Sequence, residues 1–136
     1  DGAKMSKSYG NTIDIFCSEK ELKKAVSRIV TDSTPMEEPK NPLTCNIFAL
    51  AKLFLENDEV EVLKKRYEKG GEGYGHFKAH LQGLIWDYFA PAREQRDYYM
   101  AHQNEVMAIL EEGAQKARMI ASEKIRLIRD LVGIYR

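Results

Sequence analysis

Residues 74–92 read YGHFKAHLQGLIWDYFAPA, and this stretch decides the fold class of the chain. Its apolar side chains recur three or four positions apart, the spacing that places them on one face of an α-helix. They are Phe77, Leu81, Leu84, Ile85, Tyr88, Phe89 and Ala92. We therefore predict a long amphipathic helix here. Pro91 should kink or end it, because proline offers no backbone N–H.

The same spacing continues toward the amino terminus. A stripe that begins at Leu22 predicts a helix over residues 19–30, and Ser18 with Glu21 forms a capping-box pattern in front of it. Asn41 and Pro42 are typical of a helix start. Two further stripes follow: Leu43, Ile47, Leu50, Ala51 and Phe54, then Val60, Leu63 and Tyr67 after a boundary at Asn57 or Asp58.

Between these stripes and the central one, residues 70–75 read GGEGYG. The spacing differs from that of phosphate-binding glycine loops, so we interpret the segment as a tight turn that ends a helix. A last helix is predicted from about residue 104 to residue 132, weakened by Gly113 and with Ser122 as a candidate restart. No alternating pattern is longer than four residues. We expect an all-α fold, a bundle of five or six helices preceded by an amino-terminal loop.

Composition restricts the function. The chain has 136 residues, with 21 Lys and Arg against 21 Asp and Glu, which excludes a uniformly basic nucleic-acid-binding protein. The charge is uneven, however: residues 116–136 carry six basic side chains against two acidic ones. No run of apolar residues is long enough to cross a membrane, so we expect no membrane partner. Cys17 and Cys45 suggest two reduced thiols and a cytoplasmic location. The chain begins with Asp1 and its first methionine is Met5, so we expect a piece of a longer protein.

The first eleven residues suggest phosphate chemistry. Residues 4–8 read Lys-Met-Ser-Lys-Ser, and Tyr9, Gly10 and Asn11 follow. A mobile loop with two ammonium groups can close over a polyphosphate, and positioning with electrostatics is most of what phosphoryl chemistry requires. From the residues alone, a solvated basic terminus is the alternative.

Four segments together resemble the tryptophanyl-tRNA synthetase family, in its bacterial branch. Residues 4–16 (KMSKSYGNTIDIF) contain the signature loop of class I aminoacyl-tRNA synthetases and its continuation. Residues 27–35 (SRIVTDSTP), 71–78 (GEGYGHFK) and 112–121 (EGAQKARMIA) resemble further segments of that family in the same order. The resemblance covers nearly the whole chain, and the sheet-containing part that precedes the signature loop in this family is not in it.

The resemblance implies a carboxy-terminal piece of a ligase. Residues 1–17 would be the signature loop and a connector from a missing catalytic domain, and residues 18–136 a helical anticodon-binding domain. The parent would activate tryptophan with ATP, accompanied by Mg²⁺, and transfer it to tRNA(Trp), whereas this piece alone would be inactive. The parent would be a homodimer in the cytoplasm, with no DNA or membrane partner.

The resemblance also implies roles for single residues. Lys4 and Lys7 would be catalytic through the ATP phosphates, with Lys7 the first choice for stabilising the departing pyrophosphate. Met5, Ser6 and Ser8 would complete the ATP-binding loop, while Gly10 and Asn11 are read as a hinge and a loop-ending cap. Candidate RNA contacts come from the basic end of the chain: Lys116, Arg118, Lys124, Arg126 and Arg129.

Several alternatives stay open. A tyrosyl-tRNA synthetase carries the same kind of loop, and a non-catalytic tRNA-binding paralogue would share the helical part. A plain helical interaction domain would leave the four segments unexplained. His76 and His80 have a zinc-compatible spacing but lack further ligands, so we expect no metal site. Tyr98 and Tyr99 near His102 suit either base stacking or packing at a helix end.

Overall fold

The computed structural model describes residues 2–134 and divides into two compact units, Asp1–Arg93 and Glu94–Arg136. The outer ends of the two predicted domains, residue 1 and residues 135–136, lie outside the described residues. Within the described part every regular element is helical, and the six α-helices agree with the predicted number. The all-α fold class is therefore confirmed, and the two units are described separately.

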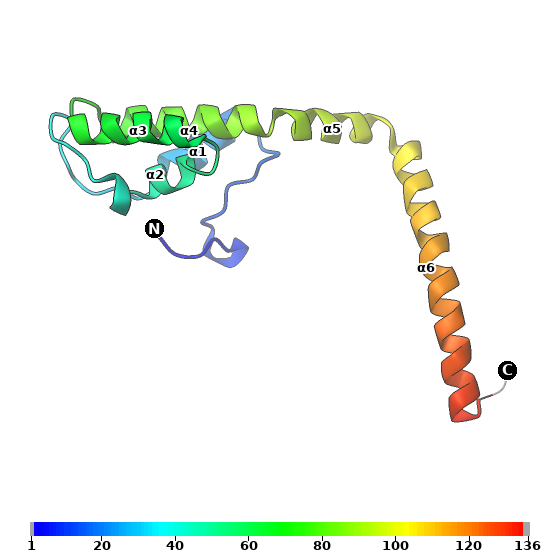
Figure 1. The fold of residues 1–136 in the computed structure, drawn as a ribbon. Helices are drawn as coiled ribbons and strands as arrows, with labels where there is room; N and C mark the ends of the chain where they lie inside the picture. Colours follow the sequence, from blue (N-terminus) through cyan, green and yellow to red (C-terminus); the bar gives the residue numbers. More distant parts are fainter. Residues whose placement is uncertain (1, 135–136) are drawn as a thin grey trace. The chain divides into compact units, whose positions relative to one another are not determined.

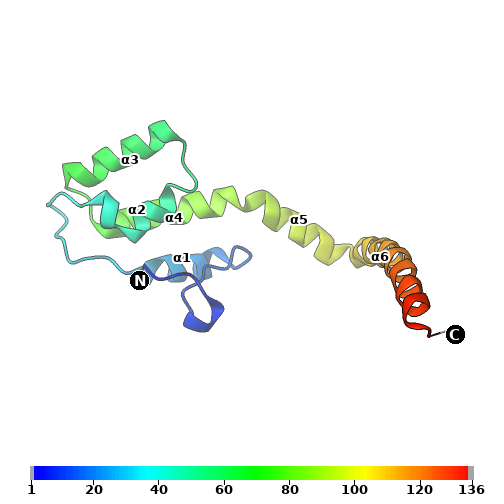
Figure 2. The same ribbon diagram turned by 60° about the horizontal axis from the view of Figure 1, so that its bottom comes forward.

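The first unit contains two short 3-10 turns and four complete α-helices. In chain order these are η1 (Lys7–Tyr9), α1 (Glu19–Ser27), η2 (Pro42–Thr44), α2 (Asn46–Ala51), α3 (Asn57–Lys69) and α4 (Tyr74–Tyr88) (Figure 1). α4 packs against both α1 and α2. Figure 2 shows α2 and α4 lying between α1 and α3. The central stripe of the sequence thus becomes the central helix of this unit.

The core of the first unit is built around α4. Phe77, Leu81 and Ile85 are buried on its inner face, as the stripe predicted. The Tyr67 ring from α3 stacks on the Phe77 ring with centroids 3.8 Å apart, and Phe48 from α2 meets Tyr67 edge-on. The remaining buried apolar residues are Leu22, Val26, Cys45, Ile47, Ala51 and Leu63. Burial of these side chains is the main force that holds the four helices together.

Two helix ends differ from the predictions. α1 ends at Ser27 rather than residue 30, because the chain turns at Arg28 and the Ile29 amide bonds to the Val26 carbonyl. The predicted cap at Asn41 is confirmed, since its side chain accepts from the Leu43 amide. The segment it caps is the short turn η2, however, and α2 begins only at Asn46. Leu43 is therefore 84% exposed, and its assignment to an apolar stripe was wrong.

The predicted capping box in front of α1 is confirmed. The Ser18 hydroxyl accepts from the Glu21 amide, and Glu21 accepts from the Ser18 amide. α3 carries a second box of this kind, but its cap is Glu56 and not Asn57 or Asp58. The side chain of Glu59 accepts from the Glu56 amide in return. A carboxylate at a helix start is favourable because it faces the positive end of the helix dipole.

The glycine-rich segment after α3 is a tight turn, as predicted. Gly70 has a φ of 72°, a conformation that L side chains rarely adopt. A Cβ atom at Gly70 would also lie 2.6 Å from the Glu37 carbonyl oxygen. The Gly71 amide bonds to the Met36 carbonyl, so the turn is closely packed on the loop before η2. Glycine is therefore required at position 70 by both conformation and space.

Lys40 is buried in that same loop, with only 2% of its surface exposed. Its ammonium group donates to the carbonyl oxygens of Pro35, Met36 and Glu38 at 2.9, 3.2 and 3.1 Å. It also lies over the Tyr74 ring. All three donors of the ammonium group are thus satisfied, which is the condition for burying such a charge. The Lys40 side chain therefore fixes the loop before η2 and places it against Tyr74 at the start of α4.

The central helix ends before Pro91, as predicted. α4 stops at Tyr88, and α5 (Ala90–Ala101) starts with Pro91 in its first turn, where the missing N–H costs nothing. The Arg93 guanidinium covers the Trp86 ring at 3.7 Å and donates to the Trp86 carbonyl. This contact caps the last turn of α4 within the first unit.

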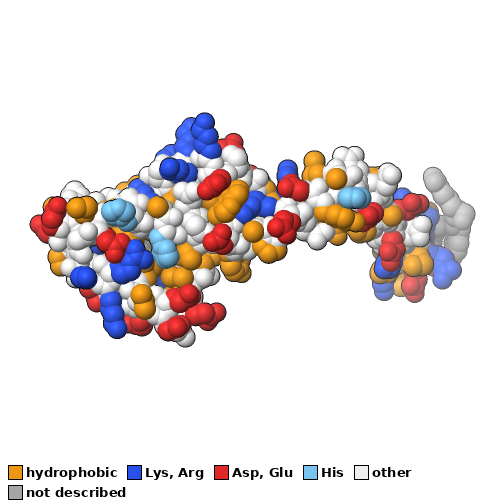
Figure 3. All heavy atoms as spheres, turned by 90° about the horizontal axis from the view of Figure 1, so that it is seen from above, with side chains coloured by type: hydrophobic (Ala, Val, Ile, Leu, Met, Phe, Trp, Pro, Cys, Tyr) orange, Lys and Arg blue, Asp and Glu red, His pale blue; other side chains and the backbone are white. Residues whose placement is uncertain are grey.

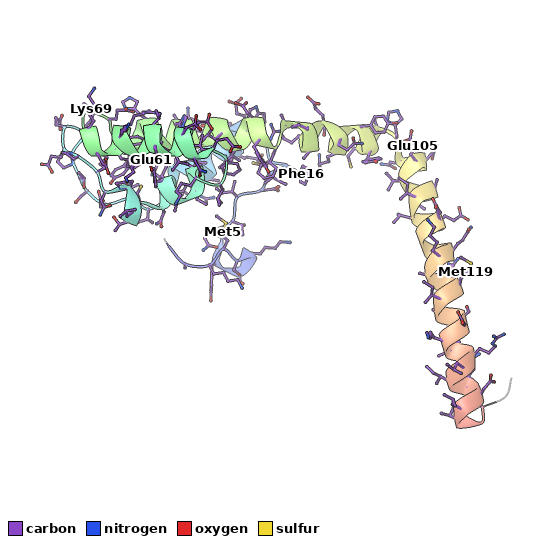
Figure 4. The ribbon with its side chains drawn as sticks, viewed as in Figure 1. Met5, Phe16, Glu61, Lys69, Glu105 and Met119 are labelled. Carbon is purple, nitrogen blue, oxygen red and sulfur yellow. The ribbon has the colours of Figure 1, made fainter. Side chains whose placement is uncertain are left out.

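The second unit consists of the rest of α5 and of α6 (Gln103–Val132). α6 continues without interruption through Gly113 and Ser122, so the possible restart at Ser122 does not occur. It ends at Gly133, which has a φ of 73°. Figure 4 shows the side chain of Met119 projecting from this helix. In the described part of the chain, no helix is long and apolar enough to span a membrane.

Candidate functional site

The signature loop is a turn with a defined backbone. Ser6 precedes η1, and the Tyr9 amide bonds to the Ser6 carbonyl at 3.1 Å. The Gly10 amide bonds to the Lys7 carbonyl, and Gly10 itself is left-handed with a φ of 63°. That conformation reverses the chain after Tyr9 and is readily adopted by glycine. The loop therefore returns toward its own start at Asn11.

Both lysines of the loop project into solvent. Lys4 and Lys7 are exposed, and neither ammonium group has a hydrogen-bond or ion-pair partner among residues 2–134. The hydroxyl groups of Ser6 and Ser8 lie 2.9 Å apart and bond to each other. Two unneutralised positive charges on one short turn attract an anion, and a polyphosphate offers several oxygens at once.

The side chain of Asn11 ties the loop together. Its Oδ1 accepts from the Ser6 amide at 2.7 Å, and its Nδ2 donates to the Lys4 carbonyl at 3.3 Å. The two bonds engage the peptide groups on either side of Met5. Met5 lies on the segment drawn beneath the helices of this unit in Figure 4. Asn11 is thus more than the loop-ending cap that the sequence suggested.

A cavity of about 510 Å³ lies between the signature loop and the helices of the first unit. Met5, Gly10 and Asn11 line it from the loop, Arg28 from the end of α1, and Leu50 from α2. Its lining combines apolar side chains such as Leu50 with the polar groups of Asn11, Arg28 and Asn46. The signature loop and the ends of α1 and α2 therefore border a common cavity.

Two of the segments that resemble the synthetase family meet in space. The Tyr74 hydroxyl, in residues 71–78, donates to Asp32 Oδ1 in residues 27–35 at 2.8 Å. The Thr34 amide donates to the same oxygen at 2.9 Å. The bonds from Thr34 and Tyr74 lower the pKa of Asp32, and burial with the bond to Asp32 raises the pKa of Tyr74 to about 12. Asp32 therefore holds the loop after α1 against α4.

A second set of polar side chains lies on α3, on α4 and in the turn between them. Arg66 donates two hydrogen bonds to the Glu72 carboxylate, at 3.0 and 2.6 Å. These bonds lower the pKa of Glu72. His80 lies nearby, and its partial burial lowers its pKa. Figure 3 shows histidines beside basic and acidic groups on this face. Among the described residues no three His, Cys, Asp or Glu side chains are placed to hold a metal ion together.

The five candidate RNA contacts all lie on α6 and are exposed. At roughly 100° per residue, Arg118, Arg126 and Arg129 fall within one arc of about 80°. Lys116 is paired with Glu112 at 2.6 Å. Lys124 falls on the opposite side, among apolar residues such as Ile120 and Ile128. The helix therefore presents three arginines on one face rather than five equivalent cations.

Tyr98, Tyr99 and His102 form a cluster between the end of α5 and the start of α6. The His102 ring stacks on Tyr98 at 4.1 Å, and the Tyr98 hydroxyl donates to Glu105 at 2.8 Å. Tyr99 packs edge-on against Tyr98. These contacts satisfy the aromatic groups locally, as expected for packing at a helix end. The one charged side chain in these contacts is the acidic Glu105.

Sequence reasoning missed Lys40 and the role of Asn11. Burial of a lysine is signalled by no local pattern, because its partners are backbone carbonyls. The sequence does contain a signal for Asn11, because this asparagine directly follows Gly10 at the end of the loop that carries Lys4 and Lys7. An amide at the point where the chain returns is well placed to bond the backbone it meets.

The family described as tRNA synthetases class I (W and Y) matches residues 1–90 of this chain. That range includes the signature loop, the loop that Asp32 holds, and α4.

Curated relatives extend the similarity to nearly the whole chain. "Tryptophan--tRNA ligase" of Campylobacter jejuni strain RM1221 is 55% identical over 134 residues, which is 98% of this chain and 42% of that protein. The protein of the same name from Fusobacterium nucleatum is 48% identical over 98% of this chain. The chain thus spans about two fifths of the length of the curated relatives it matches.

Solved structures give the same result in three dimensions. The crystal structure of tryptophanyl-tRNA synthetase from Campylobacter jejuni matches with a TM-score of 0.94 and 55% identity, over 97% of this chain and 43% of that one. A second structure of that enzyme, complexed with ADP and tryptophan, also has a TM-score of 0.94, at 56% identity.

Proposed function

The chain belongs to the class I tRNA synthetases of the W and Y type, and from this premise we propose that its parent protein is a tryptophan--tRNA ligase. The parent would join tryptophan to AMP at the expense of ATP, release pyrophosphate, and transfer the tryptophanyl group to tRNA(Trp). The chain supplies the carboxy-terminal part of that enzyme. By itself the chain is proposed to be inactive.

The observation that carries this proposal is the state of the signature loop. Lys4 and Lys7 extend from a backbone fixed by its own turn, and their ammonium groups are unpaired within residues 2–134. When ATP reacts at its α-phosphate, negative charge accumulates on the departing pyrophosphate. Preorganised positive charge at that point stabilises the transition state more than the ground state. We assign this role to both lysines, and to Lys7 first.

The other loop residues are proposed to complete the ATP site. Ser6 and Ser8 offer hydroxyl groups toward the phosphates, and Met5 anchors the loop on the cavity side. Mg²⁺ would arrive with ATP, bound by the phosphate oxygens as part of the substrate. The described residues provide no cluster of three acidic, histidine or cysteine ligands of their own.

The helical part is proposed to contact tRNA. Residues 1–17 would belong functionally to the catalytic part, and residues 18–136 to the anticodon-binding part. The guanidinium groups of Arg118, Arg126 and Arg129 on one face of α6 suit RNA phosphates. Lys116 and Lys124 complete the proposed set with weaker support, because one is paired and the other lies on the apolar side. The parent would act as a homodimer in the cytoplasm, where its tRNA is used.

The test is amino-acid-dependent exchange of pyrophosphate into ATP by the full-length parent. Each of the twenty amino acids is tested separately. Exchange with tryptophan alone supports the proposal. The family covers both W and Y enzymes, so exchange with tyrosine would move the assignment to a tyrosyl-tRNA synthetase. A folded parent that exchanges with no amino acid would point to a non-catalytic tRNA-binding paralogue.

A further inference from the structure

The amide of Asn11 makes an arrangement that no other side chain of the loop makes. One of its atoms accepts from the Ser6 amide at 2.7 Å, and another donates to the Lys4 carbonyl at 3.3 Å. A side-chain amide is planar and carries both a donor and an acceptor, so it can pair with an extended backbone as a neighbouring strand would. The two bonds fix the backbone of Met5 and its neighbours.

These bonds link the backbone of Lys4 to the backbone of the turn that contains Lys7. Lys4 provides the carbonyl at one end of the clamp. Lys7 opens the turn η1, which Gly10 closes through its amide bond to the Lys7 carbonyl at 3.2 Å. Asn11 comes directly after Gly10. The backbone of Lys4 and the backbone of Lys7 are therefore held in one closed frame, while their ammonium groups stay free.

We propose that Asn11 is a positioning residue for the activation step: it sets the relative placement of Lys4 and Lys7 and contacts neither ATP nor tRNA itself. This inference rests on the proposed function. Rate enhancement by charge depends on where the charge is held, and a displacement of about 1 Å can cost on the order of a hundredfold in rate. A loop without the clamp keeps both charges but loses their common frame.

The chemistry of the amide predicts which substitutions matter. Asn11→Ala removes both bonds. Asn11→Asp keeps an acceptor for the Ser6 amide but places a second carboxylate oxygen against the Lys4 carbonyl, where two acceptors repel each other. Both variants break the bond to Lys4, and only one changes the charge. A shared loss of activity therefore reports the clamp and not the charge.

The experiment uses the full-length parent and separates the two half-reactions. Tryptophan-dependent pyrophosphate exchange measures activation. Single-turnover transfer from preformed enzyme-bound tryptophanyl-adenylate to tRNA measures the second step. For both Asn11 variants we expect kcat for exchange to fall about tenfold to a hundredfold. The KM for tryptophan and the transfer rate should stay within about twofold of the wild type.

Asp14→Asn is the matched control. It replaces Asp by Asn, the reverse of Asn11→Asp, three residues further along the chain. The side-chain oxygen that remains in Asp14→Asn can still accept from the Phe16 amide, as Asp14 Oδ1 does in the wild type. We expect exchange and transfer to be unchanged. Titration of active sites by the burst of adenylate corrects all rates for unfolded protein.

The outcomes separate this inference from the function on which it rests. Wild-type parent without tryptophan-dependent exchange overturns both. If the Asn11→Ala variant exchanges pyrophosphate at the wild-type rate, the positioning role alone is overturned. Equal losses in exchange and transfer, or a loss in Asn11→Asp only, also overturn it, because they indicate a general structural effect or a charge effect. A selective loss of exchange in both variants supports it.

Discussion

The Tyr74 hydroxyl donates a 2.8 Å hydrogen bond to the carboxylate of Asp32, although 42 positions separate the two residues. The bond joins the loop after α1 to the first turn of α4. Nearby, the Lys78 ammonium group donates to the Ser27 carbonyl at 2.8 Å. The two links hold the end of α1 and the start of the loop that follows it on the central helix.

This relationship predicts an acid-dependent stability. The folded pKa of Asp32 lies below its unfolded value, which is near 4. Its contribution is therefore complete above about pH 4 and is lost as the pH falls through the lower folded value. Replacing Asp32 by Asn should flatten the decrease of unfolding free energy as the pH falls below about 4, as measured by urea titration.

Tyr74→Phe provides the comparison for that measurement. It removes only the hydroxyl donor and should lower the unfolding free energy at pH 7 by about 1 kcal/mol. If the pH dependence in acid is the same in wild type, Asp32→Asn and Tyr74→Phe, Asp32 is not the group that titrates.

Leu81 should be the most sensitive apolar position tested. It has no exposed surface and lies in the middle of α4. Leu81→Ala should lower the unfolding free energy by about 2–5 kcal/mol, because it removes buried contacts and leaves a cavity. The matched control is Leu53→Ala: Leu53 is 70% exposed, and its loss should cost less than about 0.5 kcal/mol. Trp86, the one tryptophan of the chain, reports unfolding by fluorescence.

Lys40 should tolerate no apolar replacement of similar length. Lys40→Met removes the donor that the carbonyls of Pro35, Met36 and Glu38 share, and a hydrogen bond from a charged group contributes about 1.5–3 kcal/mol. We expect a marked drop in thermal midpoint. Lys52→Met, at the exposed end of α2, makes the same change without these partners and should leave the midpoint nearly unchanged. Equal midpoints for the two variants would show that the Lys40 bonds contribute nothing.

The three arginines on one face of α6 should contribute to tRNA affinity through phosphate contacts. Replacing Arg118, Arg126 and Arg129 by Gln in the parent should weaken binding and reduce the slope of log K against log salt by about 2, since each contact releases a counterion. The control triple changes Lys20, Lys23 and Lys24, which are exposed on α1. A control that weakens binding as much would attribute the effect to net charge.

The sequence predicts the fold well where the pattern is local. Helical spacing identified α1, α3, α4 and α6, and Pro91 marked the end of α4, because periodicity and proline chemistry act within a few residues. The capping box at Ser18 was equally local. Helix boundaries were less predictable. Asn41 and Pro42 are good helix-start residues, yet they begin only a 3-10 turn. Leu43 was therefore assigned to a buried helix face although it is exposed.

The sequence proposes the residues of the candidate site but not their geometry. Lys4 and Lys7 are recognisable from their spacing and from the resemblance. The clamp by Asn11 depends on the reversal at Gly10, and the burial of Lys40 depends on carbonyls that the folded loop brings together. Both are tertiary arrangements of backbone groups, which side-chain patterns do not report.

The most direct test of the central claim is tryptophan-dependent pyrophosphate exchange by the parent with Lys7→Ala and Lys4→Ala, and with Lys20→Ala as an exposed lysine outside the loop. The account predicts that Lys7→Ala lowers kcat for exchange by about a hundredfold to a thousandfold, the usual cost of removing a group that stabilises transition-state charge. Lys4→Ala should also reduce it, and Lys20→Ala should behave as wild type. Full exchange in the Lys7→Ala and Lys4→Ala proteins would contradict the role assigned to the signature loop.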